Sequence, residues 1–201
     1  MIIVKTYKIF SSLLVYPSKE VKDNVDLFFS ILKDDKLLPG FILSSLSVFF
    51  SYFKETDLIV LQENYVSMFD RKKDLSLYLF EHIHGDSKER GMAMVDLKNL
   101  YRSSDLDLDV NGELPDYIPV FLEYLSTLSV EKSSILLGEI INILVIIRKR
   151  LELYESLYYL IFSSLEYLSN VKPDNDLIKA VFSNKKIDLN IDKEWEDPKV
   201  F

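Results

Sequence analysis

Residues 129–151 read SVEKSSILLGEIINILVIIRKRL, and this stretch decides the fold class. Between Ile135 and Ile147 the polar interruptions are Glu139 and Asn142. The pattern predicts one long apolar helix that begins at Ser129, whose hydroxyl can cap it. The apolar run falls short of the ~20 residues that a membrane span needs. Such a helix must therefore bury its surface against other helices, as in a bundle.

The same helical spacing of apolar residues recurs along most of the chain. Five glycines and six prolines in 201 residues leave few breaks between helices. We predict an all-α, single-domain bundle of about eight or nine helices, with Thr6, Ser18 and Asp116 as further N-caps. The expected helices cover residues 6–16, 18–32, 41–54, 57–69, 75–84, 87–101, 116–128, 129–151 and 154–168.

The predicted domain covers residues 1–170, and residues 171–201 are expected to form a polar, acidic, partly ordered tail. Residues 103–114 match no helical stripe and are expected to form a loop. In the helix expected from residue 87, four apolar side chains are candidates for burial. These are Met92, Val95, Leu97 and Tyr101.

Charge and composition exclude several classes of function. The chain has no cysteine, so disulfides and thiolate metal sites are excluded. Its net charge of −8 is a poor match for nucleic acid and suits a partner with positive charge. The apolar residues near the start follow no basic stretch, and no cleavage site follows them, so we expect a cytoplasmic protein without membrane insertion.

Candidate catalytic residues are sparse. The two histidines, His82 and His84, are two residues apart, so on one helix their rings diverge. The chain has no HExxH motif, and its glycines are too scattered for a phosphate loop. The residues therefore favour a protein that is not an enzyme and has no cofactor or metal of its own. A metal-dependent hydrolase that uses Glu81 with these histidines remains the alternative from another class.

Two segments combine aromatic side chains with fixed charges. The first covers residues 65–96, and the second, residues 113–119, reads ELPDYIP. Tyrosine, phenylalanine and methionine beside charges are typical of a groove that holds a peptide. The alternative is that the aromatic residues are ordinary core at helical spacing.

These segments also carry a resemblance to a known family. Residues 65–85 read YVSMFDRKKDLSLYLFEHIHG, and this run resembles the NarJ-type assembly chaperones of respiratory nitrate reductase, which are TorD-like maturation chaperones. Residues 90–97, residues 113–125 and the closing residues 195–201 are also similar to the family. Two positions depart from its pattern: Tyr117 stands where histidine is frequent, and Lys88 where arginine is commoner.

The resemblance implies a non-enzymatic chaperone that is a monomer or weak dimer. Its partner would be the apo catalytic subunit of nitrate reductase, bound through the N-terminal segment until the molybdenum cofactor is inserted and the complex assembles. A maturation chaperone for another molybdoenzyme and a subunit that stays in the finished complex remain alternatives. Direct contact with the molybdenum cofactor is left open.

The expected peptide site lies between the segments 65–84 and 113–125. The aromatic residues would supply contact area, the carboxylates would face basic residues of the peptide, and the histidines would couple release to pH. The expected peptide-binding residues are Tyr65, Phe69, Tyr78, Phe80, Glu81, His82, His84, Glu113, Pro115, Asp116 and Tyr117. Asp70, Arg71 and Arg90 are expected to fix loops between helices.

Overall fold

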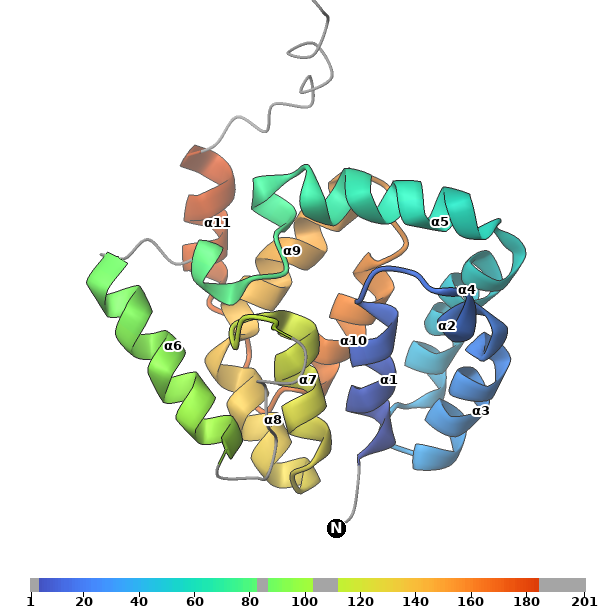
Figure 1. Cartoon of the computed structure of the whole chain (residues 1–201), viewed down its shortest axis with the longest axis horizontal. Coiled ribbons are helices and arrows are strands. Elements are labelled where there is room, and N and C mark those ends of the chain that lie inside the picture. Colours follow the sequence, from blue (N-terminus) through green and yellow to red (C-terminus); the bar gives the residue numbers. More distant parts are fainter. Residues whose placement is uncertain (1–3, 83–86, 103–111, 185–201) are drawn as a thin grey trace, which may run out of the picture.

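The computed structural model describes residues 4–82, 87–102 and 112–184 (Figure 1). Within these residues the chain is all-α, as predicted, with eleven α-helices and three short helical turns. The α-helices are α1 (Lys5–Leu13), α2 (Lys19–Asp23), α3 (Val25–Asp35), α4 (Gly40–Glu55), α5 (Leu58–Tyr65), α6 (Ser87–Arg102), α7 (Ile118–Ser126), α8 (Val130–Glu139), α9 (Ile141–Leu153), α10 (Tyr159–Leu168) and α11 (Asn175–Asn184). The turns are the π-helix η1 (Val66–Asp70) and the 3₁₀ turns η2 (Lys73–Leu75) and η3 (Leu79–Glu81).

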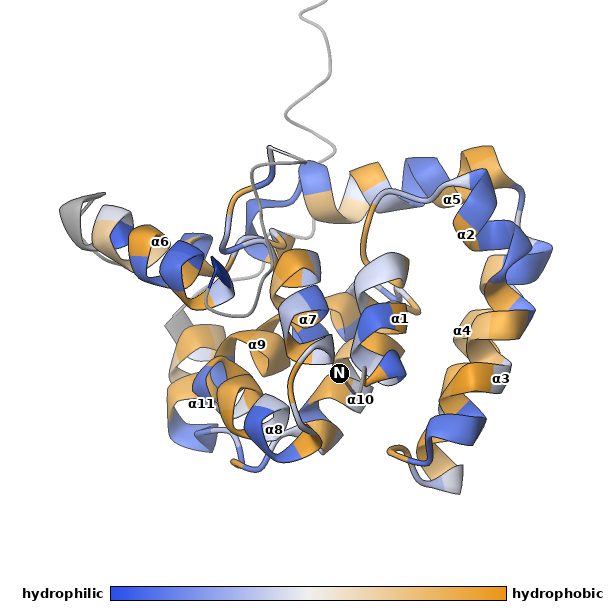
Figure 2. Cartoon of the chain, turned by 60° about the horizontal axis from the view of Figure 1, so that its bottom comes forward, coloured by the Kyte–Doolittle hydropathy of each residue, from blue (hydrophilic) through white to orange (hydrophobic). Residues whose placement is uncertain are grey.

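The hydrophobic core lies where helices distant in sequence pack together. Helix α1 packs along α7, and α9 packs along α10. In Figure 2 these four helices lie near the centre and carry much of the apolar colouring. Phe10, Leu122, Leu144 and Phe162, one from each helix, are completely buried. The amphipathic spacing read from the sequence therefore brings one continuous core together.

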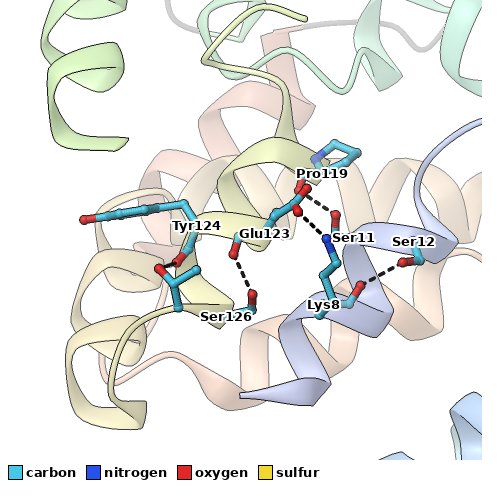
Figure 3. A network of polar contacts seen from close by, with 8 residues as sticks. Lys8, Ser11, Ser12, Pro119, Glu123, Tyr124 and Ser126 are labelled. Atoms are coloured by element: carbon cyan, nitrogen blue, oxygen red, sulfur yellow. Dashed lines mark hydrogen bonds and ion pairs between the residues drawn. The ribbon is translucent and has the colours of Figure 1, made fainter. Parts of the chain in front are cut away.

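Polar contacts fasten α1 to α7 (Figure 3). The Ser11 hydroxyl donates to the carbonyl of Pro119 at 2.7 Å, and the backbone N–H of Val4 donates to the carbonyl of Ser126 at 2.8 Å. Lys8 forms an ion pair with Glu123 across the same two helices. Pro119 lies in the first turn of α7, as predicted, where a missing N–H costs nothing.

Two predicted helices are each divided in two. The predicted helix 129–151 breaks at Ile140 into α8 and α9, and the predicted helix 18–32 breaks at Asn24 into α2 and α3. A side chain at Gly138 would come within 2.8 Å of Asn170 and 2.9 Å of Val171. The loop after α10 thus packs closely against the end of α8, a tertiary contact that the local pattern does not contain.

Of the four predicted N-caps named above, two are confirmed and two are wrong. Ser18 and Ser129 are confirmed, since each accepts a backbone N–H from the third residue after it. Thr6 is wrong as a cap, because it lies inside α1 and both its N–H and its hydroxyl donate to the carboxylate of Asp35. Asp116 is also wrong as a cap, because its carboxylate accepts the N–H of Phe80 instead of one in α7.

The predicted helix 75–84 is wrong over its described residues, 75–82. Instead, η2 and η3 flank an extended stretch, Ser76–Tyr78. The alternating leucines Leu75, Leu77 and Leu79 are all buried, as expected for extended chain. His84 lies outside the described residues, and so does the expected loop over residues 103–111.

Helix α6 lies at the edge of the molecule, where polar residues are frequent (Figure 2). Tyr101 is fully buried and Leu97 packs against the core, as predicted. Met92 and Val95 were also expected to be buried, but they are 64% and 58% exposed. They lie nearer the outer end of the helix, so α6 is held to the bundle mainly through its last turns.

The segment expected to form the tail contains helix α11. Its Ile178 is buried against Ile141, Val145 and Ile146 of α9. Residues 185–201, where the tail would continue, lie outside the described residues. Among the residues that the structure covers, no helix combines the length and apolar character required to cross a bilayer.

Candidate functional site

A two-stranded backbone contact joins the two segments in which the sequence places the peptide site. The N–H of Leu79 donates to the carbonyl of Asp116 at 2.9 Å, and the N–H of Ile118 donates to the carbonyl of Leu77 at 2.8 Å. Tyr78 and Tyr117 face each other as an antiparallel bridge. Tyr78 and Tyr117, which are 39 positions apart in the sequence, thus meet, and the backbone groups on each side of the bridge are satisfied by the other side.

Four tyrosines contact one another in series beside this bridge, and we call them the tyrosine chain: Tyr16, Tyr65, Tyr117 and Tyr78. Tyr16 meets Tyr65 edge-on, with ring centres 5.8 Å apart. The hydroxyls of Tyr65 and Tyr117 are 3.0 Å apart. The rings of Tyr117 and Tyr78 lie 5.0 Å apart. Aromatic residues in such series supply rigid contact area at interfaces.

The hydrogen bonds of the tyrosine chain have a fixed direction. Tyr65 donates its single hydroxyl proton to the carbonyl of Leu14 at 3.0 Å. A carbonyl can only accept, so Tyr117 must be the donor in its bond with Tyr65. At the far end, Tyr78 donates to the carboxylate of Glu113 at 3.4 Å.

The hydroxyls of Tyr65, Tyr78 and Tyr117 stay protonated near neutral pH. Burial, helped by the Glu113 carboxylate, raises the pKa of Tyr78 to about 12. Burial is also the main reason that the pKa values of Tyr65 and Tyr117 lie above the ordinary value. These three tyrosines therefore remain hydrogen-bond donors at neutral pH.

The carboxylate of Asp116 stabilises the backbone next to the bridge. The residue is fully buried, and its carboxylate accepts the N–H of Phe80 at 3.1 Å. Burial raises the pKa of Asp116, while the Phe80 N–H and the charge of Arg90 act in the opposite direction. The carboxylate expected to face a peptide thus acts on the backbone of the bridge.

His82 forms a hydrogen bond within the first of these two segments. Its Nε2 lies 2.7 Å from the carbonyl of Ser76, so this nitrogen carries the proton. Burial lowers the pKa of His82 below the ordinary value, and the nearby charge of Arg150 lowers it further. Among the described residues, no three histidine or carboxylate side chains gather as a metal site would require.

The other predicted site residues differ in exposure. Tyr65 and Phe69 are buried in the core, so they pack beneath other side chains and offer little contact area to a peptide. Partly exposed residues that can offer contact area are Tyr78, Phe80, Pro115 and Tyr117. The exposed charged residues are Asp70, Arg71, Glu81, Arg90 and Glu113.

A pocket that the sequence pattern does not predict lies next to the tyrosine chain. It has a volume of about 550 Å³ and lies between the turn after α1 and the helices α5 and η1. Tyr16, Ile59 and Val66 are among its apolar lining residues, and Glu63 and Arg71 are its charged ones. Tyr16 and Ile59 are 51% and 69% exposed, high values for large apolar side chains. Only the docking of α5 beside Tyr16 reveals the pocket.

Known nitrate reductase assembly chaperones are similar to this chain. Residues 40–139 match the nitrate reductase delta subunit family. The chaperone NarJ of Escherichia coli K12, described as a nitrate reductase molybdenum cofactor assembly chaperone, is 34% identical over 195 residues, which are 96% of this chain and 82% of NarJ. NarW of the same strain is 34% identical over 199 residues, covering 96% of this chain and 81% of NarW.

A solved structure from Archaeoglobus fulgidus, described as a redox enzyme maturation protein, has a similar fold. Its TM-score is 0.58 at 22% sequence identity, over 82% of this chain and 91% of that one. The chain belongs to the family of nitrate reductase molybdenum cofactor assembly chaperones, as the resemblance implied. It is a maturation chaperone and not an enzyme.

Proposed function

We propose that this protein binds the N-terminal segment of the apo catalytic subunit of respiratory nitrate reductase. It holds that segment until the molybdenum cofactor is inserted and the complex is assembled. The observation that carries the proposal is the tyrosine chain, which meets the surface at Tyr16 on one side and at Tyr78 on the other. A bound peptide contacts the rings of Tyr16 and Tyr78 and the pocket beside Tyr16.

The chemistry of the surface supports this partner. A leader segment with apolar and basic residues folds on binding, and the ordering lowers the net affinity, which permits release. The net charge of −8 raises the rate of encounter with such a segment. The exposed carboxylate of Glu113 lies next to Tyr78 and offers a partner for a basic residue.

Calorimetry with a synthetic peptide tests the proposal. The probe is the first 30 or so residues of the catalytic subunit of the same organism's nitrate reductase. We expect micromolar binding by the wild-type chain, and a loss of about tenfold or more in a Tyr16→Ala/Tyr78→Ala double variant. Tyr167→Ala is the matched control, because this half-exposed tyrosine lies on α10 against Phe41, away from the tyrosine chain.

The outcome separates the proposal from its alternatives. No binding at concentrations up to about 100 µM would contradict it, and so would equal losses in the double variant and the control. Co-purification addresses the alternative of a permanent subunit. We expect the chain to accompany the apo catalytic subunit and to be absent from the mature enzyme.

A further inference from the structure

Helix α6 and the turn η3 both bind the segment 115–116, which lies directly before the bridge residue Tyr117. The hydroxyl of Tyr101, in the last turn of α6, donates to the carbonyl of Pro115 at 2.7 Å. The N–H of Phe80, in η3, donates to the carboxylate of Asp116 at 3.1 Å. This short segment therefore connects α6 to the bridge and to the tyrosine chain.

The carboxylate of Asp116 is only half used by the fold. Its Oδ2 accepts the N–H of Phe80, while its Oδ1 is buried without a hydrogen-bond partner among the described residues. The whole residue is fully buried. A carboxylate oxygen that has lost its water and gained no donor costs free energy. A donor that reaches Oδ1 would therefore stabilise this segment.

Two charged side chains of opposite sign act on Asp116. Burial raises the pKa of Asp116, the charge of Arg90 on α6 lowers it, and the charge of Glu81 in η3 raises it. Tyr78 and Tyr101 also lie within the field of this carboxylate, but the hydroxyl proton of each is already donated elsewhere. Arg90 and Glu81 are exposed, and within the described part of the chain no ion pair joins Arg90 to Asp116. Among these groups, Arg90 is the donor that can still serve Oδ1.

The end of α6 that carries Arg90 is held less firmly than the other end. Tyr101 is fully buried, and its ring lies 4.9 Å from that of Tyr124 on α7. In the first half of the helix Met92 is largely exposed, and a side chain at Gly91 would meet no neighbouring atom within 4 Å. Packing at these positions therefore does not fix the distance between Arg90 and the segment 115–116.

We infer that the guanidinium of Arg90 binds Oδ1 of Asp116 when the client segment is bound, which draws the first half of α6 toward the bridge. A client that covers Tyr78 and Phe80 excludes water from this pair, and a guanidinium–carboxylate contact is stronger where water is excluded. Arg90 and Asp116 are positioning residues, because they hold α6 and η3 together and do not touch the client. This inference rests on the proposed function and adds a conformational step to it.

A double-mutant cycle tests the coupling, with the peptide described above as the probe. Arg90→Gln removes the cation, and Asp116→Asn removes the negative charge but keeps an acceptor for the N–H of Phe80. We expect each variant to weaken binding by about tenfold, and the double variant to bind no more weakly than Asp116→Asn alone. Lys132→Gln is the control, because it removes the same charge at an exposed position on α8; we expect a change of less than about threefold.

Hydrogen exchange measures the movement of α6. In the wild type we expect the amides of residues 90–95 to gain protection when the peptide binds, and in Arg90→Gln we expect a smaller gain. Arg90 is exposed, so its substitution leaves the fold intact, which chemical denaturation verifies. This measurement therefore tests the inference even if Asp116→Asn does not fold.

Three results would overturn the inference. Arg90→Gln could bind like the wild type, the losses of the two single variants could multiply in the double variant, or residues 90–95 could gain equal protection in Arg90→Gln and the wild type. Each of these results leaves the proposed function standing, because the wild type still binds the peptide. A wild-type chain that binds no peptide overturns the proposed function and this inference together.

Discussion

The paired helices α9 and α10 and the stretch from Val66 to His82 both contribute to the core, but they are held in different ways. Between α9 and α10 the contacts are largely apolar and follow helical spacing. The second stretch contains no α-helix among its residues and depends on individual polar contacts. These are the bridge to Asp116 and Ile118, the bond from His82 to Ser76, and the contact of Arg150 with Asp74.

The difference shows how a helical bundle can hold a non-helical segment in a fixed position. A regular helix uses its backbone groups internally and exposes only side chains. The stretch 66–82 leaves the helical pattern, so its backbone pairs with residues 116–118 and holds Tyr78 against Tyr117. The packed helices supply stability, and the irregular stretch positions the tyrosine chain.

The largest effect is expected from a substitution in the packed helical core. Phe49→Ala removes a fully buried ring that contacts Phe53 and Tyr158. We expect it to lower the free energy of unfolding by about 3–5 kcal/mol, because a cavity remains where the ring was. Chemical denaturation measures the change. Val48→Ala is the control at an exposed neighbour, with an expected change below about 0.5 kcal/mol. Similar losses in both variants would contradict this account of the core.

A smaller effect is expected where the irregular stretch is anchored. The guanidinium of Arg150, on α9, donates to the carbonyl of Asp74 at 2.6 Å and is nearly buried. We expect Arg150→Met to lower the free energy of unfolding by about 2 kcal/mol, the range for a hydrogen bond to a charged group.

Hydrogen exchange shows where that loss acts. In Arg150→Met we expect faster exchange at the amides of Leu79 and His82 and unchanged protection within α10. Lys149→Met is the control, because it makes the same replacement of a cation by methionine at the neighbouring, partly exposed position. An equal rise in exchange throughout α9 and α10 would show that Arg150 supports the whole bundle instead.

The smallest effect concerns pH. The pKa of His82 is lowered in the folded chain from 6.5, chiefly by burial, so the unfolded chain binds a proton more readily. Stability contributed by neutral His82 is present above pH 6.5 and is lost as the pH falls below it. His82→Gln keeps a neutral donor for the carbonyl of Ser76. When the pH is lowered from 7.5 to 5.5, the free energy of unfolding should therefore fall more in the wild type than in the variant, as measured by denaturation. Parallel curves of stability against pH would contradict this.

The sequence predicts the elements that depend on local pattern. Ser18 and Ser129 begin helices because a serine hydroxyl caps the residues that directly follow it. The break at Ile140 cannot be read locally, because it accompanies the close approach of Val171 to Gly138. The alternation of Leu75, Leu77 and Leu79 does carry a signal for extended chain, which the helical interpretation overlooked.

The candidate site is predictable to a similar degree. Both segments that meet at the bridge stand out by composition, and the structure joins them. Composition does not separate buried Phe69 from partly exposed Phe80, because both lie in equally apolar surroundings along the chain. Tyr16 lies some 50 residues before the first segment in sequence, so only the folded chain shows that it belongs with Tyr65.

The π-helix η1 spans five residues, and its closing bond runs from the N–H of Arg71 to the carbonyl of Val66. One residue more is enclosed there than in an ordinary helical turn. Deleting a single residue from η1 would let the helix continue smoothly and would turn everything after it by about 100°. The extra residue works as a spacer, so the angular position of Tyr78 relative to α5 is set by the length of one turn.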